Sequence, residues 1–172
     1  MNQLSGLLPW DDVPLWVRKM RAAQRTIVLT NGVFDLLHVG HVRYLTTARR
    51  YGDVLLVGVN SDASTRALKG PERPIIGESE RAELIVALRC VDAAVIFPQT
   101  TVHELLQLVR PDVWVKGGDW SAGSDAAKQL PEAPLASSLG IRIATPYFLS
   151  GYSTTTLIER IRRRLPADGH CP

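Results

Sequence analysis

The chain has 172 residues, of which 45% are hydrophobic and 22% charged, and these proportions are ordinary for one globular domain with a single core. Its net charge of +3 is compatible with small anionic substrates but too small to indicate a nucleic-acid partner. The 2 cysteines and the lack of an apolar run of about 18 residues argue against a disulfide framework and a membrane span, and we expect a cytoplasmic protein.

Apolar, β-prone segments alternate with segments of helical periodicity along the chain. The predicted strands are 26–30, 53–59, 93–97, 112–115 and 141–145. The predicted helices are 11–24, 40–51, a short one that begins at 60–62, 78–89, 101–109 and a last one from 153 to 165. Residues 1–9 are expected to be loosely ordered, and 68–74 to form a loop because they are rich in Pro and Gly.

This alternation is typical of the α/β class and predicts a Rossmann-like, doubly wound, parallel five-stranded sheet. If the strand order is 3-2-1-4-5, numbered along the chain, the order reverses between strands one and four. Ligands bind at such a point, beside the carboxyl ends of the strands. We divide the chain into an N-terminal helical extension (1–25), a main domain (26–165) and a flexible tail (166–172).

The segment His38-Val39-Gly40-His41 lies between the first predicted strand and the helix that follows it. The start of a helix offers free N–H groups and the positive end of the helix dipole, which suit phosphate. Two imidazoles at this place can donate hydrogen bonds to phosphoryl oxygens as negative charge moves during a reaction. A metal pair or a purely structural pair is the alternative. The metal pair is less favoured because there is no Cys cluster and no H-E-x-x-H, and no metal site made of protein ligands is expected.

Two further polar clusters follow the fourth and fifth predicted strands and are expected to meet the histidines in one crevice. Lys116-Gly117-Gly118-Asp119 offers a bare backbone that could lie against a nucleobase or ribose. Ser153-Thr154-Thr155 offers hydroxyls and N–H groups at the start of the last helix. One of these hydroxyls is also explained by ordinary helix capping.

Lys69 and Arg73 lie in the loop over 68–74, where a cation could close over a polyphosphate or simply be solvated. Gly32 permits a close approach of the backbone to a ligand, or a plain turn. The sequence has neither G-x-S-x-G nor a P-loop motif. A reaction that needs only positioning and electrostatics, such as nucleotidyl transfer, fits these residues best.

These motifs resemble the cytidylyltransferase-like nucleotidyltransferase superfamily, with its H-x-G-H signature and a second signature seen here as Tyr152-Ser153-Thr154-Thr155. Within it, the chain is most similar to the D-glycero-β-D-manno-heptose 1-phosphate adenylyltransferases. The segments that carry this likeness are 30–35, 59–64, 68–75, 115–119 and 151–161. The resemblance covers 26–165, and it implies that this main domain is a nucleotidyltransferase domain.

The resemblance implies that ATP and the heptose 1-phosphate react to give ADP-heptose, for surface glycans, and pyrophosphate, by in-line attack on the α-phosphorus. The catalytic residues would be His38, His41 and Lys69. The nucleotide would be bound by Asn31, Gly32, Val33, Phe34, His38, His41, Lys116, Gly117, Gly118, Asp119, Tyr152, Ser153, Thr154 and Thr155. The acceptor would be bound by Asn31, Asp35, Asn60, Lys69 and Arg73.

The same resemblance implies Mg²⁺ held mainly by phosphates, a homodimer or higher homo-oligomer, and no nucleic-acid or membrane partner. Many relatives carry a sugar-kinase domain upstream, and here we expect that step to belong to another chain. The segment Gly117-Gly118-Asp119-Trp120 also resembles the Gly-Asp-Asp-Trp segment of glycerol-3-phosphate cytidylyltransferases. A cytidylyltransferase for a polyol or amino-alcohol phosphate is therefore the second hypothesis, and a non-enzymatic nucleotide-binding regulator is the third.

Overall fold

The computed structural model describes residues 5–117, 130–146 and 153–164. In this part of the chain, six parallel strands form one sheet with the order β1-β4-β3-β2-β5-β6. The strands are β1 (Leu7–Leu8), β2 (Ile27–Gly32), β3 (Val54–Asn60), β4 (Ala93–Phe97), β5 (Val113–Val115) and β6 (Arg142–Ala144). Strands β2 to β6 are the five predicted ones, and their order is the predicted 3-2-1-4-5.

The sixth strand corrects the prediction of five strands and of a loosely ordered start. Leu7 and Leu8 pair with Ala94 and Val95 on the outer edge of β4. An uncovered β4 would present unpaired N–H and C=O groups along this edge, and β1 satisfies part of them. Two residues are too few to show an alternating pattern, so the sequence contains no signal for this strand.

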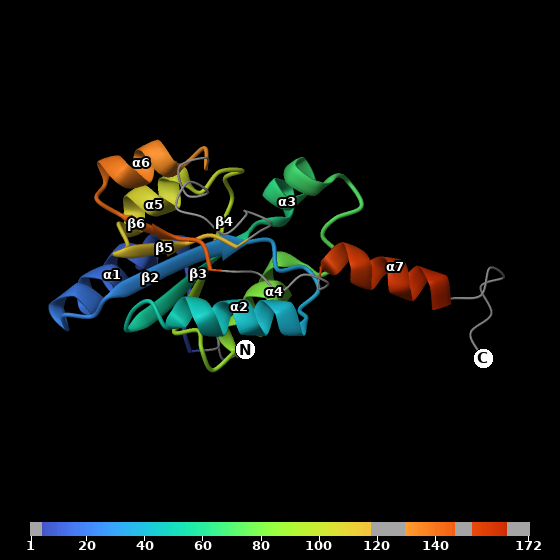
Figure 1. Cartoon of the computed structure of the whole chain (residues 1–172), viewed down its shortest axis with the longest axis horizontal. Coiled ribbons are helices and arrows are strands. Elements are labelled where there is room, and N and C mark those ends of the chain that lie inside the picture. Colours follow the sequence, from blue (N-terminus) through green and yellow to red (C-terminus); the bar gives the residue numbers. More distant parts are fainter. Residues whose placement is uncertain (1–4, 118–129, 147–152, 165–172) are drawn as a thin grey trace.

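Helices cover both faces of the sheet (Figure 1). One face carries α1 (Val13–Ala22), α5 (His103–Val109) and α6 (Ala133–Ser138). A short 3₁₀ turn, η1 (Trp10–Asp12), directly precedes α1. The other face carries α2 (Val39–Arg49) and α4 (Glu78–Val86). Neighbouring residues of β2 serve the two cores in turn, because successive side chains of a strand point to opposite faces. The sheet is thus buried on both sides, as in doubly wound folds.

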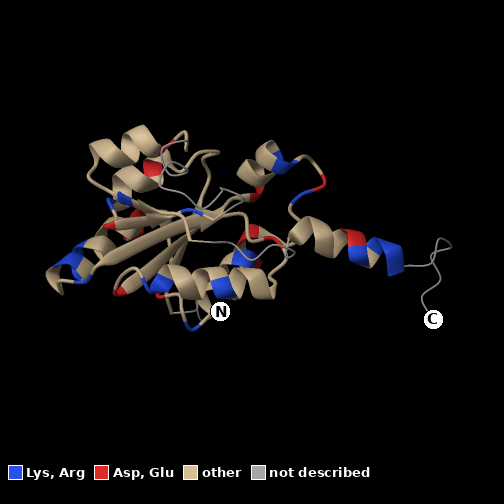
Figure 2. Ribbon diagram, viewed as in Figure 1, with Lys and Arg blue, Asp and Glu red and all other residues tan. Residues whose placement is uncertain are grey.

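Two more helices, α3 (Asp62–Lys69) and α7 (Thr154–Arg164), lie toward the carboxyl ends of the strands (Figure 1). Helix α7 extends away from the sheet, and none of its residues is buried. Its last turn carries Arg162, Arg163 and Arg164, all exposed, and Figure 2 shows this basic end far from the sheet. Cations near a helix C-terminus interact favourably with the last carbonyls of that helix.

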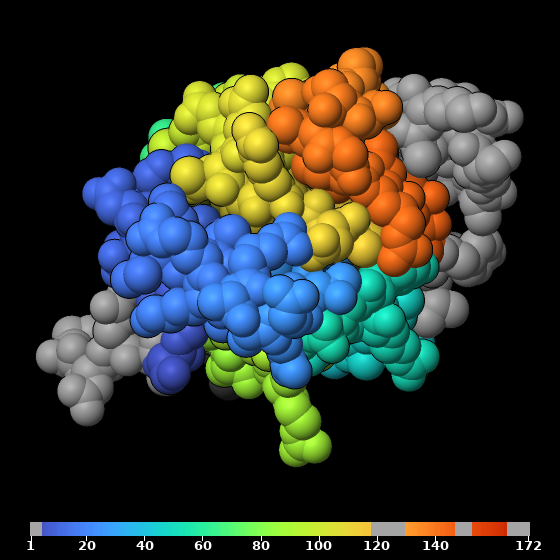
Figure 3. All heavy atoms as spheres, turned by 90° about the vertical axis from the view of Figure 1, so that its left-hand side faces the viewer, coloured from blue at the N-terminus to red at the C-terminus, as the bar shows by residue number. Residues whose placement is uncertain are grey.

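The amino ends of the strands form the opposite end of the molecule, where α1, α5 and the segment around β6 and α6 pack together (Figure 3). Asp112 organises this end. Its carboxylate accepts hydrogen bonds from Arg21 Nη1, at 2.6 Å, and from the N–H of Ile27, at 2.7 Å. Asp112 thus ties α1 to the start of β2 at this end of the molecule.

Two element boundaries differ from the prediction and affect the candidate site. β2 continues to Gly32, so Asn31 and Gly32 are its last residues rather than part of a turn. α3 extends to Lys69, which we had expected in a loop. Gly70 ends α3 with φ +94°, a conformation that glycine adopts without a steric penalty.

No helix among the described residues is long and apolar enough to cross a membrane. The proposed division of the chain at 25 and 165 stays a prediction, as does its cytoplasmic location. The described N-terminal residues contribute to the common core, where Val13 is fully buried. The predicted flexible tail, 166–172, lies outside the described residues.

Candidate active site

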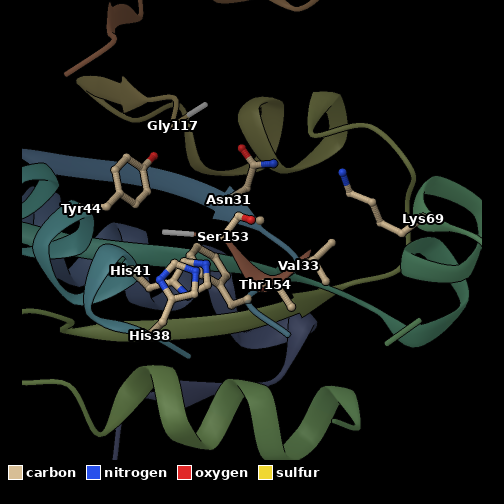
Figure 4. Close-up of a pocket in the computed structure, with 11 residues that line it drawn as sticks. Asn31, Val33, His38, His41, Tyr44, Lys69, Gly117, Ser153 and Thr154 are labelled. Atoms are coloured by element: carbon tan, nitrogen blue, oxygen red, sulfur yellow. The ribbon is translucent and has the colours of Figure 1, made fainter. Parts of the chain in front are cut away.

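A cleft with two overlapping compartments opens at the carboxyl ends of β2 and β5, where the strand order reverses (Figure 4). The smaller compartment measures about 330 Å³ and the larger about 510 Å³. Both are lined by Asn31, Gly32, Val33, Phe34, His41, Lys69, Gly117, Ser153 and Thr154. The three polar clusters that follow β2, β5 and β6 therefore meet in one place.

The two histidines of the H-x-G-H motif lie against each other at the start of α2. His38 precedes the first helical residue, and its ring stacks on that of His41 with 3.8 Å between centroids. The rings of Phe34 and His41 pack edge to face, with 5.5 Å between their centroids. The Nδ1 atoms of both histidines are buried and have no hydrogen-bond partner among the described residues. A ligand in the cleft is the natural source of the missing partners, because buried polar atoms are rarely left unsatisfied.

Burial keeps both imidazoles neutral near pH 7. It lowers the pKa of His38, and it lowers the pKa of His41 from 6.5 to about 4, with the neighbouring His38 contributing a smaller part. Two stacked rings 3.8 Å apart would repel each other if both were protonated. A bound triphosphate would reverse this balance, since nearby negative charge favours the protonated form of an imidazole.

Tyr44 ties α2 to the two central strands beneath the cleft. Its hydroxyl donates to the carbonyl of Val115, at 3.0 Å, and lies 2.6 Å from Thr30 Oγ1, which can then donate to it. Burial raises the pKa of Tyr44, so the phenol remains a donor at every working pH. Because Tyr44 stands one helical turn after His41, this anchor holds the turn of α2 that carries His41 against the sheet.

Two polar residues at the ends of β2 and β5 are held by neighbouring aromatic and acidic groups. Trp114 donates its indole N–H to Asn31 Oδ1 at 3.1 Å, which leaves the amide nitrogen of Asn31 to the cleft. Lys116 Nζ lies 5.2 Å from the centre of the Trp114 ring and 3.8 Å from Glu132 Oε1. Lys116 lines only the larger compartment.

The predicted acceptor residues Asp35 and Arg73 form an ion pair, with Arg73 Nε 2.5 Å from Asp35 Oδ2. Asp35 also accepts from the backbone N–H groups of Ile75 and Ile76, at 2.8 and 3.0 Å. Both residues line the larger compartment. Both carboxylate oxygens of Asp35 thus bind groups of the loop between α3 and α4 and hold that loop in place. Arg73 belongs to this loop and lines the larger compartment.

Asn60 is the last residue of β3, and Lys69 is the last residue of α3. Asn60 is buried and donates from Nδ2 to Ser64 Oγ at 2.8 Å, although it still lines the larger compartment. Lys69 lies at the end of α3 and points its ammonium group over the cleft (Figure 4). Within the described residues, its side chain has no ion pair or hydrogen bond, so it is available to an anionic ligand.

The hydroxyls at the start of α7 divide into two roles. Ser153 caps the helix, because its Oγ accepts from the N–H of Thr156 at 3.0 Å. Capping is therefore the structural explanation that we expected for one of these residues. Thr154 lines both compartments and Thr155 lines the larger one. The predicted residues Gly118, Asp119 and Tyr152 lie outside the described residues.

Three residues that our sequence analysis missed belong to the site or support it. Tyr44 lies at i+3 from His41, a spacing that could have revealed it. Glu132 lines the larger compartment but follows no recognisable motif. Arg81 is fully buried and donates to three backbone carbonyls around the cleft and to one carboxylate. Its partners are Val33 O, Asn60 O, Ile76 O and Asp62 Oδ1.

The described residues contain no group of three or more His, Cys, Asp or Glu that could hold a metal ion. The carboxylate nearest the histidine motif in the sequence, Asp35, is already occupied by Arg73 and two N–H groups. This donor set suits a cation that arrives bound to phosphates rather than one held by a cage of protein ligands.

Comparison with known proteins gives consistent matches. A family model described as cytidylyltransferase-like matches residues 29–160. The bifunctional protein HldE of Syntrophotalea carbinolica is 51% identical, over 84% of this chain and 28% of that protein. HldE of Geotalea uraniireducens is 49% identical, over 88% of this chain and 30% of that protein. This chain thus spans less than a third of the length of these relatives.

A solved structure is also similar. The crystal structure of the lipopolysaccharide core biosynthesis protein from Thermoplasma volcanium matches with a TM-score of 0.59 and 29% sequence identity. The match covers 73% of this chain and 99% of that one, so it takes in nearly the whole of the smaller protein.

Proposed function

This chain belongs to the cytidylyltransferase-like family of nucleotidyltransferases, and we propose that it transfers the adenylyl group of ATP to D-glycero-β-D-manno-heptose 1-phosphate. The products are ADP-heptose and pyrophosphate. The relatives named HldE and the lipopolysaccharide core biosynthesis protein support a heptose-type acceptor. The observation that carries the proposal is the stacked pair His38–His41, whose Nδ1 atoms have no partner among the described residues and which lies in a cleft shared with Lys69.

The triphosphate of ATP would lie between the histidine pair and the start of α7. His38 and His41 supply N–H donors, Thr154 and the first N–H groups of α7 supply further donors, and Lys69 supplies a cation. These groups converge on one compartment from three elements. The backbone around Gly117 would hold the nucleoside. Gly118 and Asp119, which lie outside the described residues, stay predicted nucleotide-binding residues.

The reaction needs no protein nucleophile. A phosphate oxygen of the acceptor attacks the α-phosphorus of ATP and forms a new P–O bond, while the bond to the bridging oxygen of pyrophosphate breaks in line with it. Pyrophosphate leaves with the electron pair of that bond. The protein's contribution is to position both substrates and to stabilise the charge that moves onto the phosphoryl oxygens. His38, His41 and Lys69 are the catalytic residues in this proposal.

The acceptor would occupy the larger compartment, which adds Asn60, Arg73 and Thr155 to the shared lining. Asn31 lies at the junction, because it lines both compartments. Asp35 acts indirectly, by holding Arg73 in place. Mg²⁺ bound to the triphosphate would neutralise part of its charge, and the donor set described above leaves its coordination mainly to phosphate oxygens. A homo-oligomeric assembly remains part of the proposal.

A pyrophosphate-release assay tests this function directly. The purified chain is offered ATP or CTP with D-glycero-β-D-manno-heptose 1-phosphate or glycerol 3-phosphate, with Mg²⁺ present. Turnover is expected with ATP and the heptose phosphate, and little with the other three pairs. Equal or greater turnover with CTP would replace this proposal with a cytidylyltransferase acting on a polyol phosphate. Nucleotide binding without turnover on any pair would point to a regulator. His41→Ala provides the background rate.

A further inference from the structure

The larger compartment contains a carboxylate that the proposed reaction does not use. Glu132 stands directly before α6, and 13% of its side chain is exposed. Its Oε2 atom is buried and has no hydrogen-bond partner within the described part of the chain. The other oxygen, Oε1, lies 3.8 Å from Lys116 Nζ, at the outer limit of an ion pair. A buried oxygen of this kind costs free energy unless a ligand brings the missing donor.

The compartment therefore offers two different chemistries to a ligand. Lys69 and Arg73 supply positive charge from the end of α3 and the loop after it. Glu132 supplies an acceptor oxygen from the start of α6. Figure 1 shows α3 and α6 well apart, so Lys69 and Arg73 are separated from Glu132, whose neighbouring cation is Lys116. A ligand that fills the compartment must match both ends.

We propose that Glu132 accepts hydrogen bonds from hydroxyl groups of the acceptor sugar and thereby selects a polyhydroxylated phosphate. This inference rests on the proposed function, because it assigns the acceptor to the larger compartment. A carboxylate can accept from two neighbouring hydroxyls at once, and such charge-assisted bonds are stronger than neutral ones. The same carboxylate repels phosphate. It thus directs the acceptor's phosphate toward Arg73 and the hydroxyls toward α6.

The test compares Glu132→Gln and Glu132→Leu with Glu83→Gln, a matched change of an exposed glutamate on α4 outside the cleft. Loss of a hydrogen bond to a charged group weakens binding by roughly 10- to 100-fold. The KM for heptose 1-phosphate should rise by about that factor in the leucine variant. The glutamine variant should lie between, since its amide oxygen still accepts one bond. The KM for ATP should stay within about twofold in all variants, because Glu132 lines only the larger compartment.

The acceptor panel and a binding measurement separate this inference from the proposed function. Glycerol 3-phosphate, which has fewer hydroxyls, should respond less to Glu132→Leu than heptose 1-phosphate does. Saturation-transfer NMR of heptose 1-phosphate, with the α,β-methylene analogue of ATP present, reads binding without turnover. Glu132-dependent binding without pyrophosphate release would overturn the function and leave the subsite standing.

Other outcomes overturn the subsite. Unchanged acceptor KM and binding in both Glu132 variants would leave the function and remove Glu132 from recognition. Equal losses for ATP and acceptor would mean that Glu132 only supports the fold, and no binding of heptose 1-phosphate to the wild type would overturn the inference together with the acceptor assignment.

Discussion

A Cβ atom on Gly117 would lie 2.8 Å from the Tyr44 ring, a distance that real Cβ contacts essentially never show. Glycine at 117 therefore lets the chain that leaves β5 lie directly on Tyr44, and both residues line the smaller compartment (Figure 4). Tyr44 in turn binds Thr30 in β2 and Val115, the last residue of β5. Because both residues line the smaller compartment, we expect their contact to set its size.

This contact predicts a compensating pair of substitutions. Gly117→Ala should lower kcat/KM for ATP by about tenfold or more, since overpacking typically costs about 1–3 kcal/mol. Adding Tyr44→Leu removes the ring and should restore part of the loss. Adding Tyr44→Phe keeps the ring and should restore none. Steady-state kinetics of the variants checks this, and an equal loss in the leucine and phenylalanine backgrounds would show that the ring does not set the compartment's size.

The histidine pair should act on the transition state more than on the binding of ATP. His38→Ala and His41→Ala should each fold, bind ATP and lose kcat by about a hundredfold or more, because one preorganised donor is worth about 3 kcal/mol. The double variant should lose less than the product of the two losses, since both rings act on the same phosphates.

Steady-state kinetics measure kcat for each variant, and calorimetry with the α,β-methylene analogue of ATP measures nucleotide binding. His103→Ala on α5 is the control. A His41→Ala protein that unfolds while its folded fraction retains full activity would assign the pair a structural role instead.

Lys69 should matter for turnover because its ammonium group faces the cleft without a protein partner within the described residues. Lys69→Ala should lower kcat by about tenfold or more, since the leaving pyrophosphate loses a positioned cation. Its effect on acceptor KM should be smaller. Arg66→Ala, an exposed cation one turn earlier on α3, is the matched control. Equal kcat values for the two variants would exclude Lys69 from the reaction.

The lowered pKa of His41 predicts a dependence of stability on pH. Its pKa is about 4 in the folded chain and near 6.5 when unfolded. Between these values the unfolded chain binds a proton that the folded chain does not, so the free energy of unfolding falls as the pH falls from 6.5 toward 4. Above pH 6.5 the His41 ring is neutral in both the folded and the unfolded chain, so it does not change the free energy of unfolding.

The free energy of unfolding should fall by roughly 2 kcal/mol, a value that allows for screening by solvent at a partly exposed ring. Urea unfolding at pH 7.5 and pH 4.5 measures it, and His41→Gln should show a smaller difference between the two pH values than the wild type. An identical difference in both proteins would contradict the assigned pKa. Saturating ATP analogue should shrink the wild-type difference, because phosphate favours the protonated ring.

The strands and their order could be predicted because the signals are local. Residues 54–59, for example, are all buried in the sheet, so they are apolar throughout and stand out from the helices around them. Parallel strands with helical crossovers allow few topologies, and the predicted order of five strands is confirmed. The polar clusters at the ends of strands were visible for the same reason, since a ligand site interrupts the apolar pattern.

The remaining features depend on contacts between distant parts of the chain, and the tertiary structure alone decided them. Pairing with β4, not any periodicity, makes a strand of Leu7 and Leu8. The ion pair of Asp35 with Arg73 joins residues that are 38 positions apart in the sequence. Within the described residues, Glu132 Oε2 has no partner because folding buries it, and Tyr44 meets Gly117 only across the assembled sheet. By itself the sequence determined which residues could take part in a site, whereas burial and packing decided which of them remain available to a ligand.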